Sequence, residues 1–209
     1  MTKPDLSHAY ALQTPEDCLK LYADWADSYD ADFARNRGYV LPAQVAAAFM
    51  AAGGGAPVLD VGAGTGLLGV ALAGLGLSGA IDGIDLSPAM LDRAREKGCY
   101  RTLIAADVTR PLDLPAVYRG IVSSGTFTHG HVGPEGVPPL LDIALPGARF
   151  ALSVNAGVWA ARGFPAALDA LADRIAGLTL SEVPIYDAAP DPADPHATDH
   201  ALILQFTRR

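Results

Sequence analysis

The chain has 209 residues, half of them hydrophobic, which predicts a single folded domain over residues 1–209. Its formal net charge of −8 makes a nucleic acid an unexpected partner, because contact with phosphates requires a basic face. The two cysteines, Cys18 and Cys99, are too few for a disulfide framework, so a cytoplasmic location is the default expectation.

The most informative segment is a short apolar strand that runs into a glycine-rich loop, residues 58–66 (VLDVGAGTG). An amphipathic stretch from Leu67 to Leu75 follows directly, so the loop joins a strand to a helix. Gly62, Gly64 and Gly66 can reach positive φ and let another group approach the backbone. The helix N-terminus adds unpaired N–H groups. We therefore expect this turn to bind a small polar ligand.

Two classes of ligand compete for such a loop. A dinucleotide fingerprint, G-x-G-x-x-G, requires its third glycine at the position that Leu67 occupies. Asp60 would also repel a pyrophosphate, whereas its carboxylate suits a ligand with an ammonium group. An NAD(P)-dependent oxidoreductase is therefore the disfavoured alternative.

A second acidic residue ends the next predicted strand, residues 79–85 (GAIDGID). Asp85 lies 21 residues after Gly64, where doubly wound folds place an acceptor for ribose hydroxyls. Asp82 is the competing candidate, but it lies in the middle of the strand, whereas ligands bind at the carboxyl ends.

Further acidic and helical signals follow in the same order. Ser87 and Pro88 predict the N-cap and first position of a helix that ends at Lys97. A third strand, residues 100–105, then leads to Asp107. One such aspartate is usually a turn or cap residue, but three at successive strand ends indicate a site.

This pattern, strongest from Val58 to Val108, resembles motif I and its downstream elements in class I S-adenosylmethionine-dependent methyltransferases. The cofactor of that family carries both an amino group and a sulfonium. The resemblance implies that the glycine loop binds the amino acid end, Asp85 the ribose and Asp107 the adenine. The residues implied to bind the cofactor are Tyr22, Tyr29, Asp60, Gly62, Ala63, Gly64, Gly66, Asp85, Leu86, Met90, Asp107, Val108 and Ser124.

The remaining elements complete the layout of that family. Strands alternating with helical segments also argue independently for a wound α/β sheet. The resemblance implies a Rossmann-like, doubly wound, seven-stranded sheet whose last strand is antiparallel. The expected elements are strands at 118–124 and 147–155, a helix at 165–177, and strands at 178–186 and 200–207.

The N-terminal region predicts two helices. Thr14 is the expected N-cap of the first, and Pro42 to Ala52 form the second. We expect residues 1–55 to be a helical cap over the cofactor-binding core, residues 56–209. An aromatic stripe on the first helix fits either a lid over the ligands or plain core packing; it consists of Cys18, Tyr22, Trp25 and Tyr29.

The acceptor side of the site carries fewer signals. Residues 24–30 and 126–132 (TFTHGHV) resemble the small methyltransferase-like proteins of the Williams–Beuren group. His129 aligns with a histidine that many family members carry, and a histidine is a suitable general base near neutral pH. A loop histidine bonded to backbone is the equal alternative. We expect His131 to face solvent.

Two segments resemble functional elements, a membrane span and a metal site, that we do not expect in this chain. Residues 61–81 carry no formal charge over a length that suits a membrane span, but they contain seven glycines and the ligand loop. Residues 187–200 combine aspartates with His196 and His200, and their prolines predict an exposed loop rather than a metal site. We therefore expect neither membrane contact nor a metal.

The sequence thus predicts an enzyme that transfers a methyl group from S-adenosylmethionine to a small-molecule acceptor, as a monomer or homodimer. The chain has no Asn/Asp-Pro-Pro-Tyr string, which counts against methylation of the adenine amino group in nucleic acid. It has no Pro-Cys pair at the matching loop, which counts against methylation of a cytosine carbon through a thiolate. A catalytically silent protein that binds S-adenosylmethionine is the second alternative.

Overall fold

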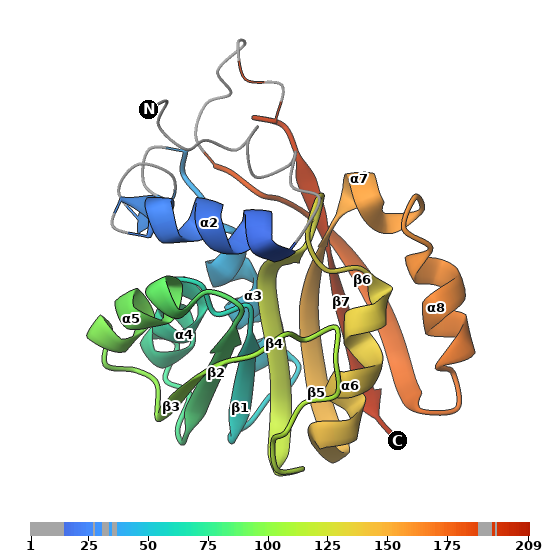
Figure 1. The fold of residues 1–209 in the computed structure, drawn as a ribbon. Coiled ribbons are helices and arrows are strands. Elements are labelled where there is room, and N and C mark those ends of the chain that lie inside the picture. The colour runs from blue at the N-terminus through green and yellow to red at the C-terminus, as the bar shows by residue number, and fades with distance from the viewer. Residues whose placement is uncertain (1–14, 27, 31–33, 35–36, 188–193, 195) are drawn as a thin grey trace.

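The computed structural model describes residues 15–26, 28–30, 34, 37–187, 194 and 196–209. A seven-stranded sheet forms its centre, with helices on both faces (Figure 1). The strand order is β3-β2-β1-β4-β5-β7-β6. The strands are β1 (Val58–Val61), β2 (Ile81–Asp85), β3 (Thr102–Ala105), β4 (Tyr118–Phe127), β5 (Ala144–Asn155), β6 (Ile175–Pro184) and β7 (His200–Arg208).

The sheet has the predicted doubly wound topology. Strands β1 to β5 pair in parallel, and β7 pairs antiparallel with both β5 and β6. Because β1 has β2 on one side and β4 on the other, the chain reverses its winding direction at β1. Open α/β sheets bind ligands outside the carboxyl ends of the strands at this switch point.

The helices are α2 (Pro15–Trp25), α3 (Leu41–Ala51), α4 (Leu67–Gly74), α5 (Pro88–Glu96), the 3-10 helix η2 (Pro134–Gly136), α6 (Val137–Ile143), α7 (Ala156–Trp159) and α8 (Phe164–Ala170). Helices α3, α4 and α5 begin and end within one residue of the predicted positions, whereas η2, α6 and α7 were not predicted. Ser87 is the N-cap of α5, as predicted, because its hydroxyl accepts from the Met90 N–H at 3.4 Å. Thr14, the expected N-cap of α2, lies outside the described residues.

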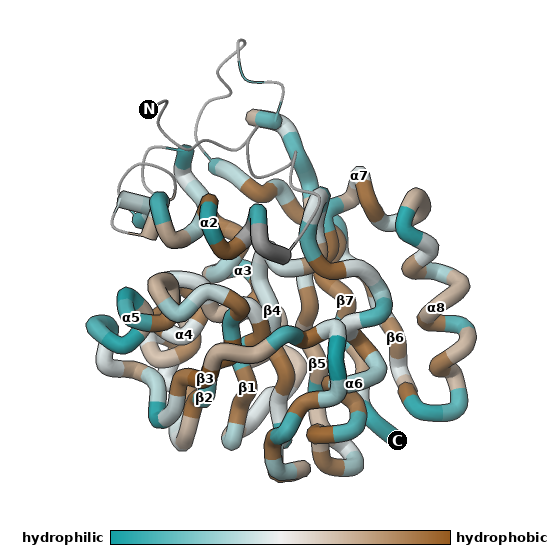
Figure 2. The backbone as a smooth tube through the Cα atoms, viewed as in Figure 1, coloured by the Kyte–Doolittle hydropathy of each residue, from teal (hydrophilic) through white to brown (hydrophobic). Residues whose placement is uncertain are grey.

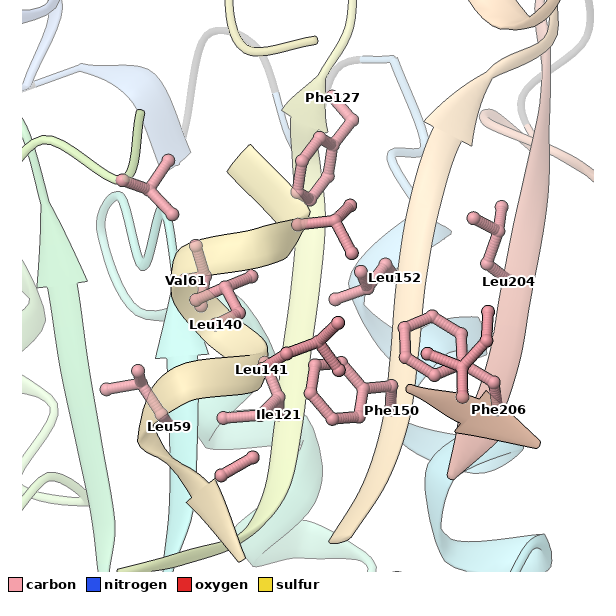
Figure 3. Packing of buried hydrophobic residues seen from close by; sticks show 14 of the residues in the cluster. Leu59, Val61, Ile121, Phe127, Leu140, Leu141, Phe150, Leu152, Leu204 and Phe206 are labelled. Carbon is pink, nitrogen blue, oxygen red and sulfur yellow. The ribbon is translucent and has the colours of Figure 1, made fainter. Parts of the chain in front are cut away.

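Adjacent residues of the central strands enter separate hydrophobic clusters, as strand geometry requires. Leu59 packs with Leu140 and Leu141 of α6 (Figure 3). Val58, its neighbour, packs in the second cluster with Phe49 of α3. Hydrophobic residues accordingly concentrate along the central strands, while α5 contains many hydrophilic residues (Figure 2).

The two N-terminal helices have different positions. Helix α2 lies across the carboxyl end of the sheet (Figure 1), where the predicted cap would be. Helix α3 packs on the sheet itself, against β4 and β5, and its Phe49 is fully buried. A Cβ at Gly54 or Gly120 would lie within 2.4 Å of the Phe49 ring. Residues 41–51 are therefore part of the core, while α2 lies over the strand ends.

One predicted boundary is wrong. The expected helix over 165–177 ends at Ala170, and β6 already begins at Ile175. The pairing of β6 with β7 is irregular between Ala176 and Thr179, and Gly177 has a φ of +65°. This irregularity breaks the alternation that marks a strand, so the start of β6 was assigned to the helix.

Within the described part of the chain, no helix is long and apolar enough to cross a membrane. The uncharged stretch 61–81 is divided among the end of β1, the glycine loop, α4 and the start of β2.

Candidate active site

A cavity of about 290 Å³ lies under α2 at the carboxyl ends of β1, β2 and β4. Three of the predicted residues, Asp60, Gly66 and His129, are not part of its lining. The other predicted residues line it together: Tyr22, Tyr29, Gly62, Ala63, Gly64, Asp85, Leu86, Met90, Asp107, Val108 and Ser124.

The three glycines of the loop all have positive φ, but they have different neighbours. A Cβ at Gly62 would lie 1.9 Å from the Thr126 hydroxyl, and one at Gly66 would lie 3.0 Å from the Tyr100 ring. At Gly64 the nearest atom would be 4.0 Å away. Gly62 and Gly66 therefore permit tight packing of the protein on itself, whereas Gly64 leaves space for a ligand against the backbone.

Two hydroxyl groups fix the start of the loop. Ser123 Oγ and Thr126 Oγ1 both donate to the Val61 carbonyl, at 2.7 and 3.0 Å. This carbonyl is the last of β1, so both of its lone pairs are used where the strand ladder stops. Sequence analysis did not identify Ser123 or Thr126 because neither belongs to the glycine pattern.

Asp85 connects the glycine loop to α5. Its Oδ2 accepts from the Gly64 N–H and its Oδ1 from the Ser87 N–H, both at 2.8 Å. Burial raises the pKa of Asp85, while these backbone donors act in the opposite direction. The Leu86 N–H is a third backbone donor to this carboxyl. A carboxylate has about four acceptor sites, so Asp85 can still accept a hydrogen bond from a ligand in the cavity.

The carboxylate of Asp82, by contrast, is bonded to two other side chains of the protein. Its Oδ1 accepts from Arg101 Nε at 2.9 Å, its Oδ2 contacts the same guanidinium, and the Tyr118 hydroxyl donates at 3.1 Å. Burial raises the pKa of this carboxyl, but Arg101 and Tyr118 outweigh that effect and lower it. Asp82 is 3% exposed and does not line the cavity. The geometry therefore favours Asp85 over Asp82 as a ligand-binding residue.

Asp60 is fully buried beneath the loop rather than in the cavity wall. The Tyr100 hydroxyl donates to its Oδ2 at 2.6 Å and accepts from the Gly69 N–H at 3.1 Å. Its Oδ1 has no hydrogen-bond partner among the described residues. Burial raises the pKa of Asp60 to about 7, with Tyr100 opposing and Asp85 adding to the shift.

The glycine loop has two features that bear on the cofactor implied by the resemblance: the Asp60 oxygen that has no partner among the described residues, and the space at Gly64. A buried carboxylate oxygen without a partner is costly, and a nearby cation would offset that cost. The space at Gly64 lets a ligand lie against the same loop. The residues present therefore fit a ligand that carries an ammonium group.

The part of the cavity that the resemblance assigns to adenine is lined by one polar residue, Asp107, and two apolar residues, Met90 and Val108. Asp107 Oδ1 accepts from the Thr109 N–H at 2.9 Å and its hydroxyl at 2.6 Å, and Arg110 lies 3.3 Å from Oδ2. Met90 and Val108, which are almost fully buried, form apolar parts of the cavity lining.

The aromatic residues of α2 and the turn after it pack on one another above the loop. The Trp25 ring lies 6.2 Å from Tyr22 and 5.1 Å from Tyr29 between centroids, and all three line the cavity. Asp30, which follows them, accepts from the Thr65 hydroxyl at 2.5 Å and forms an ion pair with Lys97. The segment over the cavity is thus bonded directly to the glycine loop.

Neither loop histidine lies where the sequence predicts it. The His129 ring lies away from this cavity, where a Cβ on Gly157 would be 3.0 Å from its Nε2. His131 lines the cavity, and its Nε2 lies 3.0 Å from the Tyr22 hydroxyl. The expectation that His131 faces solvent is therefore wrong. Both side chains follow the same strand end, and only the path of the loop decides which one turns inward.

The loop before β7 contains a local contact, in which His196 Nδ1 lies 3.2 Å from Asp199 Oδ2. Among the residues that are described, no three His, Cys, Asp or Glu side chains gather as a metal site would require. Residues 188–193 and 195 of this loop lie outside them.

Comparisons with known proteins agree with this geometry. Residues 58–142 match the model of a methyltransferase domain family. No curated protein sequence is a match to the chain.

Several solved structures share the fold. The magnesium protoporphyrin IX methyltransferase of Synechocystis is 21% identical, with a TM-score of 0.60 over 100% of this chain and 98% of that one. The 1,6-didemethyltoxoflavin-N1-methyltransferase of Burkholderia thailandensis is 23% identical, with a TM-score of 0.63 over 94% and 91%.

A third similar structure is a putative methyltransferase of Haloferax volcanii in complex with the Trm112 activator, 18% identical, with a TM-score of 0.62 over 90% and 98%. The sheet order, the glycine loop at the switch point and the domain match agree. Together they support an S-adenosylmethionine-dependent methyltransferase, with a methyltransferase domain over residues 58–142 and the fold of the solved methyltransferases.

Proposed function

We propose that this methyltransferase acts on a small molecule that binds in the cavity under α2, beside the cofactor. The observation that carries the proposal is the cavity itself. It combines the open backbone at Gly64 and the carboxylate of Asp85 with an aromatic cover formed by Tyr22, Trp25 and Tyr29. A covered cavity of this kind suits a small acceptor better than a polymer.

The end of the cavity that we propose for the cofactor lies along β1, β2 and β3. Asp85 accepts the ribose hydroxyls and Asp107 the adenine amino group, while Met90 and Val108 contact the adenine ring. The backbone around Gly64 binds the amino acid part, and the buried charge of Asp60 acts on its ammonium from beneath the loop. The remaining proposed contacts are Tyr22, Tyr29, Gly62, Ala63, Leu86 and Ser124, with Gly66 supporting the turn.

The proposed acceptor end lies toward β4, β5 and β7. Its lining consists of Ser124 of β4, Asn155 of β5, Ala201 of β7 and Tyr186, which lies two residues after the end of β6. Two similar structures are named for small acceptors, a magnesium protoporphyrin and a didemethyltoxoflavin. The acidic net charge of the chain also disfavours a nucleic acid.

The bound cofactor supplies a methyl group on a positively charged sulfur. The protein contributes position and exclusion of water. Asp85 and the loop backbone fix the donor, while Tyr22, Trp25 and Tyr29 cover the site. We further propose that residues 1–209 act as one domain, as a monomer or homodimer in the cytoplasm.

Transfer of labelled methyl groups tests the proposal. The protein is incubated with methyl-labelled S-adenosylmethionine and, separately, with the small-molecule, RNA and protein fractions of a cell extract. We expect label in the small-molecule fraction, and much less there with the Asp85→Ala variant. Label only in RNA or protein would contradict a small acceptor.

Asp85→Ala should weaken binding of S-adenosylhomocysteine by roughly ten- to a hundredfold, because a charged acceptor contributes about 1.5–3 kcal/mol. Isothermal titration calorimetry measures the affinity. Asp82→Ala is the matched control, since it removes the same side chain from the same strand. It should leave the affinity close to that of the unchanged protein but lower the free energy of unfolding by about 1–3 kcal/mol, because Tyr118 loses a buried partner. The opposite pattern would assign the ribose contact to Asp82.

Gly64→Val should abolish binding of S-adenosylhomocysteine, because the side chain would fill the space beside the loop and oppose a φ of +54°. The backbone strain should cost about 1–3 kcal/mol of folding stability. Gly74→Val is the control: a Cβ there meets nothing within 4 Å, and the residue lies on an exposed turn of α4. Binding by the Gly64 variant, measured in the same titration, would show that the loop is only a structural turn.

A further inference from the structure

His131 has a defined tautomer because its two ring nitrogens have different partners. Nδ1 lies 2.6 Å from the His129 carbonyl oxygen, which can only accept, so Nδ1 carries a proton. Burial lowers the pKa of His131, and the charge of Arg162 adds to this effect against the opposing carbonyl contact. The ring is therefore neutral near neutral pH, and Nε2 accepts from the Tyr22 hydroxyl at 3.0 Å.

The main chain around this imidazole is fixed from a neighbouring element. Arg162, after α7, donates from Nη1 to the His131 carbonyl at 2.7 Å. The same guanidinium lies 3.5 Å from Glu135 of η2, whose carboxylate accepts from the Gly133 N–H at 2.8 Å. Among the described residues, the titratable groups around His131 include Tyr22 from α2, His129 on the same loop, Arg162 and, behind it, Glu135. They hold the loop so that Nε2 points to the Tyr22 hydroxyl.

The part of the cavity beside this pair is aromatic. The rings of Tyr22 and His131 lie 5.6 Å apart, edge to face, and Trp25 and Tyr29 continue the wall. Among the described residues that line the cavity there is no lysine or arginine. Such a wall favours a flat, uncharged ring over a carboxylate or phosphate.

We propose that Tyr22 and His131 form a proton relay for the methyl acceptor, and that the acceptor is an uncharged aromatic molecule with a hydroxyl group. This inference rests on the proposed function and names its substrate class. The Tyr22 oxygen accepts a hydrogen bond from the acceptor hydroxyl while its own proton points to Nε2. Tyr22 touches the substrate, and His131 receives the proton through it.

Methyl transfer and the proton relay together conserve atoms and charge. The acceptor oxygen forms a bond to the methyl carbon as the carbon–sulfur bond breaks, and that electron pair stays on the sulfur. The hydroxyl proton passes to the Tyr22 oxygen, and the Tyr22 proton passes to Nε2. His131 becomes an imidazolium and later returns the proton to water.

One arm of the test needs no acceptor. Nuclear magnetic resonance of the imidazole nitrogens should show the Nδ1–H tautomer for His131 in the unchanged protein. Tyr22→Phe should raise the pKa of His131, because the donor that favours the neutral ring is lost. An Nε2–H tautomer, or an unchanged pKa in the variant, would overturn the pairing.

The second arm measures formation of S-adenosylhomocysteine with phenol, catechol and resorcinol, and with benzoate and benzylamine as charged probes. We expect turnover of the hydroxyl probes. His131→Gln should lower kcat by roughly a hundredfold or more with little change in KM, as for a lost general base. His200→Gln, at an exposed histidine at the start of β7, is the matched control and should leave kcat unchanged.

Calorimetry with S-adenosylhomocysteine separates this inference from the proposed function. The histidine variants should bind it as the unchanged protein does, which also shows that each is folded. Binding without turnover of any hydroxyl probe would overturn the acceptor class while the cofactor site stands. A loss of kcat in His129→Gln but not in His131→Gln would overturn the relay and return the base to His129. Absence of cofactor binding in the unchanged protein would instead contradict the proposed function.

Discussion

The turn from β1 into α4 is the constraint on which the site depends. Its backbone needs positive φ at three positions, and the Val61 carbonyl at its start uses both lone pairs on Ser123 and Thr126 of β4. Asp85 of β2 then fixes its centre through the Gly64 N–H. Three neighbouring strands thus set the shape of one loop, and the space beside Gly64 exists because the sheet positions it.

The same turn is connected to the segment above the cavity. Thr65 donates to Asp30, and Asp30 also pairs with Lys97 after α5. A ligand in the cavity would therefore lie between the loop and an aromatic cover that are bonded to each other. Closing elements of enzymes are drawn from less stable parts of a fold, and Trp25, at 4% exposure, is packed as tightly as a core residue. The interpretation of α2 as a lid stays a prediction.

Much of the fold follows from local rules that the sequence displays. The strand ends, the Ser87 cap and the glycine loop each depend on a few adjacent residues, so the sheet and its antiparallel last strand were predicted and are confirmed. The partners of Asp60 were not predictable in this way, because Tyr100 comes from another strand region 40 positions away. His129 and His131 differ only in the path of a short loop, which depends on Arg162 and Tyr22, distant in sequence. The early end of α8 was missed because an irregular strand hides its alternation.

The central claim is that the cavity binds S-adenosylmethionine rather than a nicotinamide dinucleotide. Thermal unfolding with S-adenosylmethionine, S-adenosylhomocysteine, NAD and NADP, each added separately in excess, tests it most directly. A ligand at 100 times its dissociation constant adds about 2.7 kcal/mol to the stability of the folded state. The two adenosyl ligands should raise Tm by several degrees, and the dinucleotides should leave it unchanged. Stabilisation by NAD or NADP, with none from the adenosyl ligands, would contradict the account.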